Sequence, residues 1–178
     1  LNRRNARREI FHKDADYEAF LRCLDQGLGR YPVQLLSFCL MPNHWHLVLR
    51  PTKDGAMGRL MGWVGATHTA RYHAHNHTAG TGHLYQGPFK SFPVQDDGHF
   101  LTLCRYVERN ALAAGLCEKA EDWRWGSLYR WKHKSDRDPK LISSWPVRRP
   151  PGWLARVNEE LSERELEQLR NSIRRGTP

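Results

Sequence analysis

The chain has 178 residues and a formal net charge of +9 at pH 7, with 28 Lys and Arg against 19 Asp and Glu. Its hydrophobic content of 39% excludes a disordered protein, and no apolar run approaches the roughly 18–20 residues of a membrane-spanning helix. The positive excess favours a polyanionic partner, although a basic surface can also serve solubility alone.

The chain begins with a basic stretch and one helix. Arginines crowd the first eight residues, at positions 3, 4, 7 and 8, and such clustering indicates a contact surface more than general solubility. Asp14 can cap a helix, and Gly27 and Gly29 mark its end. The apolar face of this helix follows a helical period and consists of Tyr17, Phe20, Leu21, Leu24 and Leu28.

Two strands and a second helix follow. Residues 33–40 (VQLLSFCL) predict a strand, and residues 41–43 (MPN) predict a turn. Residues 44–50 (HWHLVLR) predict a second strand, antiparallel to the first. Apolar residues at helical spacing then run from Met57 to about Asn76.

A broken segment separates this helix from a third one. Residues 79–82 (AGTG) interrupt the chain, and residues 83–94 predict an extended hairpin or a bulged strand. Asp96 or Asp97 can cap the third helix, which Gly115 stops.

The C-terminal part has a different composition. Residues 132–152 combine prolines, glycines and charges, which predicts a linker. Beyond it, Ser162 and Glu165 have the spacing of a capping box and begin a short helix. We therefore expect an α+β fold with a domain over residues 1–131, followed by a basic linker and C-terminal helix and tail over residues 132–178.

Two histidines in the second predicted strand give the first chemical signal. Residues i and i+2 of a strand point to the same face, so His44 and His46 project together. The other face carries Trp45, Leu47 and Leu49. Two imidazoles on a rigid element are well placed to hold one metal ion. Two ordinary polar residues on a solvated sheet face would give the same pattern, so the pair alone is weak evidence.

The third helix carries the second signal. Tyr106 and Asn110 are one helical turn apart and share a face. That face lies roughly 90° from the centre of the apolar stripe, at the edge of the core, where it can face the sheet. Periodicity alone favours the simpler alternative, a partly buried tyrosine and a surface asparagine.

In combination, these motifs resemble the HUH single-tyrosine transposases, in which two histidines flank a hydrophobic residue and a nucleophilic tyrosine follows on a later helix. The closer resemblance is to their domesticated bacterial branch, the REP-associated tyrosine transposases. Five segments in the family's order carry it over nearly the whole chain: NRRNARREIF (2–11), MPNHWHLVL (41–49), GHLYQGPFKSF (82–92), RYVERN (105–110) and SIRRGTP (172–178).

The resemblance implies a ferredoxin-like antiparallel sheet with helices on one face and DNA on the other. It makes His44 and His46 metal ligands, Asn110 a third ligand and Tyr106 the catalytic nucleophile. The implied activity is that of a sequence-specific single-stranded DNA endonuclease and strand transferase. It would act on hairpins of repetitive extragenic palindromes with Mg²⁺ or Mn²⁺, through a 5′-phosphotyrosine intermediate.

The sequence departs from the family pattern at three places. Only Leu1 remains of the family's first strand, so we expect the catalytic domain over residues 1–131 to continue upstream. Arg4 stands where a glycine is usual, in a segment that the resemblance places against DNA. Ala113 stands where an arginine is common, which removes one cation near the tyrosine.

The DNA contacts are expected from basic and polar side chains near the N-terminus and near Tyr106. Tyr85 and Phe89 are candidate stacking surfaces, although core positions suit them as well. The expected DNA-binding residues are Arg3, Arg4, Asn5, Arg7, Arg8, Lys90, Arg105 and Arg109.

Three functions compete on these observations. The first is an active nicking and rejoining enzyme, and the second is a hairpin-DNA-binding protein that does not cleave. The third, a metal hydrolase of small molecules, fits a net charge of +9 poorly. The presence of all four proposed chemical residues favours the first. We expect no second metal site at His73, His75, His77 and His83, because their segment runs into a glycine-rich loop.

The remaining expectations concern partners and location. DNA hairpins are the expected partner, no membrane is involved, and the protein is a monomer or a homodimer. The resemblance implies a bacterial cytoplasmic protein associated with the nucleoid. The four cysteines lie in apolar segments without a C-x-x-C pair, which predicts buried free thiols.

Overall fold

The computed structural model describes residues 1–4, 8–133 and 141–176. A three-stranded antiparallel sheet forms its centre, in the order β1-β3-β2, from β1 (Asn2–Arg3), β2 (Val33–Met41) and β3 (His44–Pro51). β2 and β3 form a hairpin closed by the predicted turn. The α+β class and the antiparallel sheet are thus confirmed.

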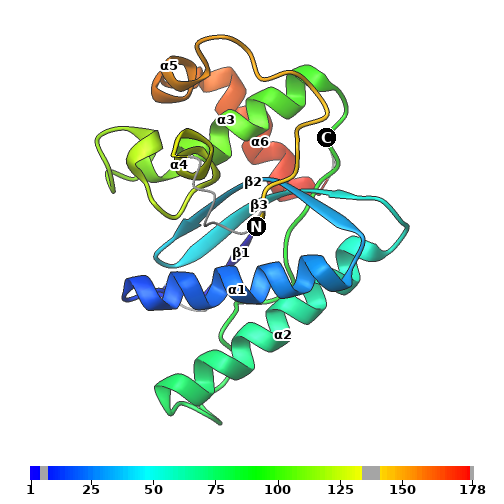
Figure 1. Cartoon of the computed structure of the whole chain (residues 1–178), viewed down its shortest axis with the longest axis vertical. Coiled ribbons are helices and arrows are strands. Elements are labelled where there is room, and N and C mark those ends of the chain that lie inside the picture. The colour runs from blue at the N-terminus through cyan, green and yellow to red at the C-terminus, as the bar shows by residue number, and fades with distance from the viewer. Residues whose placement is uncertain (5–7, 134–140, 177–178) are drawn as a thin grey trace.

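Two long helices cover one face of the sheet (Figure 1). They are α1 (Asp14–Arg30) and α2 (Ala56–Asn76), which pack against each other and against the strands. The strands contribute Leu35, Phe38 and Trp45 to the core on this side. α1 contributes side chains at the predicted helical spacing, namely Tyr17, Phe20, Leu21 and Leu24.

Helices also cover the opposite face (Figure 1). They are α3 (Asp97–Ala113), α4 (Ser127–Lys132), α5 (Trp153–Asn158) and α6 (Glu163–Arg175), with a short 3₁₀ turn, η2 (Ala120–Asp122), before α4. Residues of the C-terminal segment belong to the same hydrophobic cluster as α3 and the strands. This segment therefore packs over the sheet, and it does so through Trp153, Val157, Leu161 and Leu169.

Helices on both faces differ from the one-sided arrangement that we expected. The reason lies in β2, which is buried almost without interruption, as a strand covered on both sides must be. Leu35 and Phe38 point to α1 and α2, whereas Leu36 and Cys39 point to α3. A register shift between Leu35 and Ser37 interrupts the simple alternation of the strand.

Residues 83–94 run beside β1 without forming a regular strand in the described chain. Leu1 and Lys90 exchange backbone hydrogen bonds of 2.9 and 3.0 Å. Pro88 has no N–H to donate, and together with Gly87 it interrupts the pairing. The predicted hairpin or bulged strand is thus an irregular segment that borders the sheet.

The outer edge of β2 is bonded to the C-terminal half of the chain. The indole N–H of Trp123 donates to the carbonyl of Leu40 over 2.9 Å. The indole N–H of Trp145 donates to the carbonyl of Leu36 over 2.7 Å. These donors satisfy carbonyl groups that a sheet edge would otherwise leave without partners.

The predicted caps of two helices are confirmed. Asp96 accepts a hydrogen bond of 2.8 Å from the backbone N–H of His99 at the start of α3. Ser162 and Glu165 form a reciprocal capping box at the start of α6. The cysteines are free, as expected. None of the described helices has the length and apolar character of a membrane span.

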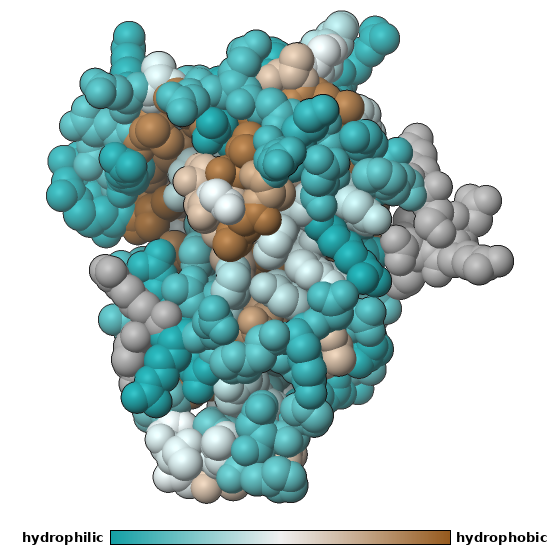
Figure 2. Space-filling model, turned by 90° about the vertical axis from the view of Figure 1, so that its left-hand side faces the viewer, coloured by the Kyte–Doolittle hydropathy of each residue, from teal (hydrophilic) through white to brown (hydrophobic). Residues whose placement is uncertain are grey.

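The face of the molecule drawn in Figure 2 is mostly hydrophilic, with apolar residues unevenly distributed on it. Figure 2 shows them gathered in the upper half of the molecule, the half that contains α3 to α6, while the half around α1 and α2 is largely polar. Among the described residues, the exposed large hydrophobic side chains are those of Val94, Leu116 and Trp131.

A first prediction concerns the crossing of α1 and α2 at Gly27. A Cβ atom at this position would lie 2.8 Å from Cδ1 of Leu60 and 3.0 Å from Cγ2 of Val64. Gly27→Ala should therefore lower the free energy of unfolding by about 1–3 kcal/mol through overpacking. A Cβ atom at Gly29 would meet open space, so Gly29→Ala should raise that free energy by about 0.4–1 kcal/mol. Urea unfolding measures both, and equal effects would contradict the close crossing.

Candidate active site

β3 places two imidazoles side by side on the face that α3 covers. The ring centroids of His44 and His46 are 5.0 Å apart. His46 is 6% exposed and His44 is partly buried. Trp45 points into the opposite core, where its indole N–H donates to the hydroxyl of Tyr85 over 3.1 Å. The alternation of the strand thus brings both histidines to one side.

α3 brings the tyrosine and the asparagine to the same place. The ring centroids of Tyr106 and His46 are 5.7 Å apart, and the rings meet edge to face. The side-chain amide nitrogen of Asn110 donates to the carbonyl of Tyr106 over 3.1 Å. This hydrogen bond does not use the amide oxygen of Asn110. Residues from two distant segments therefore converge as the sequence spacing predicted.

The surroundings keep both imidazoles neutral. Burial, with a smaller contribution from Arg3, lowers the pKa of His44 to about 4. Burial also lowers the pKa of His46 well below its usual value, with His44 and Arg3 adding to the effect. Arg3 is paired with His44 across the sheet. Neutral imidazole is the form that binds a metal ion.

One hydrogen bond determines which ring nitrogen of His44 can bind a metal ion. Its Nδ1 lies 2.6 Å from Oδ1 of Asn43. Because an amide oxygen only accepts, Nδ1 carries the hydrogen and donates it. The lone pair therefore lies on Nε2 of His44, and a neighbour that fixes the tautomer in this way is typical of histidine ligands.

These donors fit a divalent ion whose shell is completed by other groups. Two imidazoles and one amide oxygen leave much of a six-coordinate shell for water and substrate oxygens, as Mg²⁺ or Mn²⁺ sites often do. In the described part of the chain, no group of three or more His, Cys, Asp or Glu side chains could hold a metal ion.

One cleft of about 650 Å³ is lined by His44, His46, Tyr106 and Asn110 together. Among the described residues of its lining, Glu160 is the one carboxylate. Basic side chains from separate parts of the chain outnumber it, namely Arg3, Lys90, Arg109, Arg170 and Arg174. The cleft therefore has an excess of positive charge that suits an anionic ligand.

Three of the expected DNA contacts lie in this cleft. Arg3, Lys90 and Arg109 line it, and the Nε of Arg3 is buried without a hydrogen-bond partner among the described residues. Arg109 also donates from Nε to the carbonyl of Glu159 over 2.9 Å.

The other N-terminal candidates are placed differently. The guanidinium of Arg4 donates to the carbonyl of Glu9 and stacks on the ring of Tyr72. Arg8 is exposed and is not part of the cleft lining. Asn5 and Arg7 lie outside the described residues.

Arg105 has a position that the sequence did not suggest. It is 9% exposed, and each of its three guanidinium nitrogens has a partner in the C-terminal segment. Nε donates to the carbonyl of Arg156 over 2.6 Å, and Nη2 donates to the carbonyls of Glu159 and Glu160 over 3.1 and 2.8 Å. Nη1 lies 3.4 Å from Oε1 of Glu165. Arg105 thus holds the connection between α5 and α6 against α3, and it is not part of the cleft lining.

Tyr85 likewise belongs to the core. Its hydroxyl lies 2.6 Å from Nδ1 of His68 and accepts the hydrogen bond from Trp45. The ring is 9% exposed, so it offers no stacking surface in this conformation. Phe89, the other candidate, is partly buried beside the same core.

A buried carboxylate ties α3 to the C-terminal segment. Glu108 accepts hydrogen bonds from the indole N–H of Trp153 over 2.7 Å and from the hydroxyl of Ser127 over 3.0 Å. The guanidinium of Arg149 lies 3.7 Å from it. Burial raises the pKa of Glu108, and Arg149 and the two donors oppose that rise. This network fixes the helix that carries Tyr106.

Sequence reasoning missed the contribution of α6 to the cleft. Leu166, Arg170, Ile173 and Arg174 line it beside Tyr106. Their spacing of four, three and one puts them on one side of a helix. The signal was present in the sequence, because Arg170 and Arg174 lie one helical turn apart on the side of the helix that carries Leu166 and Ile173.

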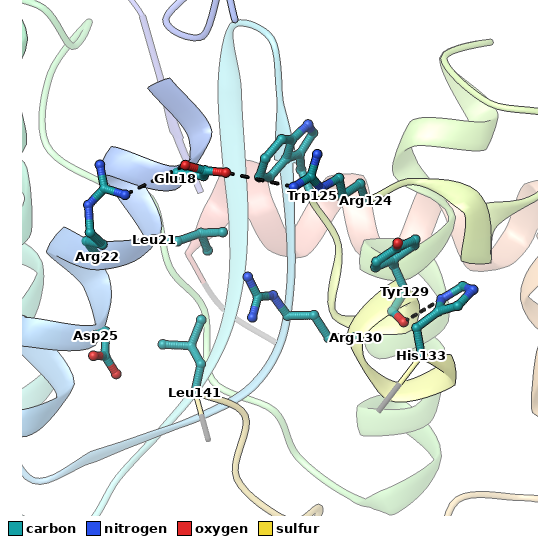
Figure 3. Close-up of a pocket in the computed structure, with 10 residues that line it drawn as sticks. All are labelled: Glu18, Leu21, Arg22, Asp25, Arg124, Trp125, Tyr129, Arg130, His133 and Leu141. Atoms are coloured by element: carbon teal, nitrogen blue, oxygen red, sulfur yellow. Dashed lines mark hydrogen bonds and ion pairs between the residues drawn. The ribbon is translucent and has the colours of Figure 1, made fainter. Parts of the chain in front are cut away.

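A separate pocket of about 390 Å³ lies between α1 and α4 (Figure 3). Its charges pair with one another, because Glu18 lies 3.8 Å from the guanidinium groups of both Arg22 and Arg124. It contains none of the expected catalytic, metal-binding or DNA-binding residues, and it is distinct from the cleft at α3.

Comparisons with known proteins agree with this arrangement. The family model of the IS200-like transposases (Y1_Tnp, "Transposase IS200 like") matches residues 1–110. Among solved structures, a REP-associated tyrosine transposase bound to a REP hairpin matches with a TM-score of 0.61 and 13% identity. The match covers 82% of this chain and 89% of the other, and at that identity it shows the fold. No curated protein matches the chain significantly.

A second prediction tests the position of Arg105. Arg105→Gln should lower the free energy of unfolding by about 2–3 kcal/mol, because several partly buried hydrogen bonds from a charged donor are lost. Arg164→Gln, at an exposed position of α6, should change it by less than about 0.5 kcal/mol. Thermal and urea unfolding give both values. If Arg105→Gln leaves stability unchanged and instead weakens DNA binding, Arg105 is a phosphate contact after all.

Proposed function

Since the chain belongs to the IS200-like transposase family, we propose that it cuts and rejoins single-stranded DNA beside a hairpin, with Tyr106 as the nucleophile. The observation that carries the proposal is the convergence of Tyr106 and Asn110 with His44 and His46 in one basic cleft. The solved relative was bound to a REP hairpin, which supports a palindromic hairpin as the substrate class.

The basic side chains of the cleft would bind and orient the DNA backbone. Arg3 and Lys90 line the cleft together with the histidines, and cationic side chains donate charge-assisted hydrogen bonds to phosphate oxygens. Such contacts position a strand without reading its sequence.

His44, His46 and Asn110 would hold a divalent ion, Mg²⁺ or Mn²⁺. When bound, the ion offsets the negative charge of a phosphate and orients it for in-line attack. The hydrogen bond from His44 to Asn43 keeps the ligating nitrogen in the correct tautomer. The low pKa of each histidine means that no proton has to leave before the ion binds.

The phenol of Tyr106 would carry the covalent step. Its oxygen forms a bond to phosphorus, the bond from phosphorus to the 3′ oxygen breaks, and the proton of the phenol leaves while the 3′ oxygen gains one. The products are a 5′-phosphotyrosine and a free 3′ hydroxyl. Because phosphotyrosine keeps the energy of the phosphodiester, a 3′ hydroxyl can reverse the step and rejoin strands without ATP.

The runner-up is a protein that binds hairpins without cleaving them. The same basic cleft would serve that function equally well. The placement of the tyrosine ring against one of the two histidines favours cleavage, because mere binding does not require it.

The third prediction concerns Tyr106. Wild-type protein, incubated with a 3′-labelled hairpin oligonucleotide carrying a single-stranded flank and Mn²⁺, should form a covalent adduct that survives a denaturing gel. The adduct should contain the 5′ end of the downstream fragment. Tyr106→Phe should form none, because it removes one oxygen and keeps the ring.

Tyr129→Phe is the matched control, since Tyr129 lies at the pocket between α1 and α4, and it should form the adduct normally. Cleavage by Tyr106→Phe would mean that water or another residue attacks. Tight hairpin binding by the wild type without a cut or an adduct would establish the runner-up.

The fourth prediction concerns the metal ligands. His44→Ala should slow cleavage by at least about 100-fold, since several kcal/mol of charge stabilisation depend on the ion. Hairpin affinity should change much less, because it comes mainly from phosphate contacts. His75→Ala removes an exposed histidine of α2 instead and should leave cleavage unchanged. Full activity of His44→Ala would remove His44 from the site.

A further inference from the structure

We propose that α6 is a wall of the DNA-binding cleft, in which Arg170 and Arg174 bind phosphates of the single strand that flanks the hairpin. The inference rests on the proposed function and deepens it. It assigns a binding surface to a part of the chain that lies beyond residues 1–110, which the family model matches.

The first step is that α6 has a fixed place beside the site. Leu169 is 1% exposed and Ser172 is 6% exposed, both on the side of α6 that meets the core. The capping box of Ser162 and Glu165 defines where the helix begins. α6 is thus a packed element of the fold, and its other side chains have defined positions.

The second step is that the catalytic helix itself holds α6. Arg105 and Arg109 flank Tyr106 and Asn110 in the sequence, and both bond to the connection between α5 and α6. Glu159 accepts from both arginines. The distance between α6 and the tyrosine is therefore set by bonds from residues next to the tyrosine.

The third step is the orientation of the arginines. Arg170 and Arg174 are one turn apart, exposed, and part of the cleft lining together with Tyr106 and Asn110. Arg174 is bonded to Asn171 over 3.0 Å. Within the described residues, neither arginine has an ion pair. Two cations without a carboxylate are available to an anion from solution.

The fourth step is the charge of the lining as a whole. Glu160, its one carboxylate among the described residues, lies 3.9 Å from the guanidinium of Arg109. The positive charge of Arg3, Lys90, Arg170 and Arg174 is therefore not neutralised inside the cleft. These residues belong to β1, the segment that follows α2, and α6, and several cations from separate elements suit a chain of phosphates better than a single small anion.

The test compares two double variants with the same loss of charge. Arg170→Gln with Arg174→Gln alters the cleft side of α6. Arg164→Gln with Arg175→Gln is the control, because at about 100° per residue those two side chains point roughly 80–140° away from Arg170 and Arg174 around the helix, and neither lines the cleft. Unchanged melting temperatures show that each variant is folded.

Fluorescence anisotropy measures affinity for a hairpin with a single-stranded flank and for the hairpin alone, at several salt concentrations. The cleft variant should bind the flanked hairpin about 10-fold more weakly or worse. Its slope of log affinity against log salt should fall by about 1.4, as the loss of two single-strand phosphate contacts implies. The control variant should bind within about 2-fold of wild type, and the hairpin alone should distinguish the variants little.

Equal losses in the two variants would overturn the inference, since bulk charge would then explain them. Faster cleavage by the cleft variant would also overturn it, because α6 would then be obstructing the site. As an independent check, Arg170→Cys should form a disulfide with a thiol tethered to a flank phosphate, and Arg164→Cys should not. Adduct formation by wild type in the same samples separates failure of this inference from failure of the proposed function.

Discussion

The pleat of β3 is the constraint on which the site depends. Trp45 is almost fully buried, and its indole is hydrogen-bonded to Tyr85, which fixes the rotation of the strand. Because neighbouring side chains of a strand alternate, His44 and His46 must then face α3. A slip of one residue would put both imidazoles into an aromatic core and the indole into the cleft. The packing of one core thus determines the chemistry on the opposite face.

α3 must meet the sheet, the cleft and the C-terminal segment at the same time. Residues that are adjacent in its sequence contact different neighbours. Arg105 and Arg109 bond to the connection between α5 and α6, whereas Tyr106 and Asn110 face the histidines. Glu108 adds a buried anchor. Tyr106 and Asn110 are therefore held on a helix that is bound from two directions, which favours precise positioning.

Local patterns in the sequence predicted much of this arrangement. The alternation of β3 and the one-turn spacing of Tyr106 and Asn110 depend only on backbone geometry, and Asp96 or Ser162 with Glu165 are short-range caps. The role of Arg105 could not be predicted, because its acceptors are backbone carbonyls some fifty residues further on, which any sequence can supply. The apolar run of β2 indicated that the strand is buried along most of its length. Only the fold shows which helices cover each side.

The covered edge of β2 has a consequence for synthesis. The indoles of Trp123 and Trp145 reach that edge from positions more than eighty residues after the strand. At about 5–20 residues per second, a ribosome takes several seconds or more to make that stretch. Throughout that interval, the nascent chain presents an apolar strand with open carbonyl groups, which is a template for pairing with other chains. Nascent chains on neighbouring ribosomes of one messenger are thus the first copies that this strand can meet.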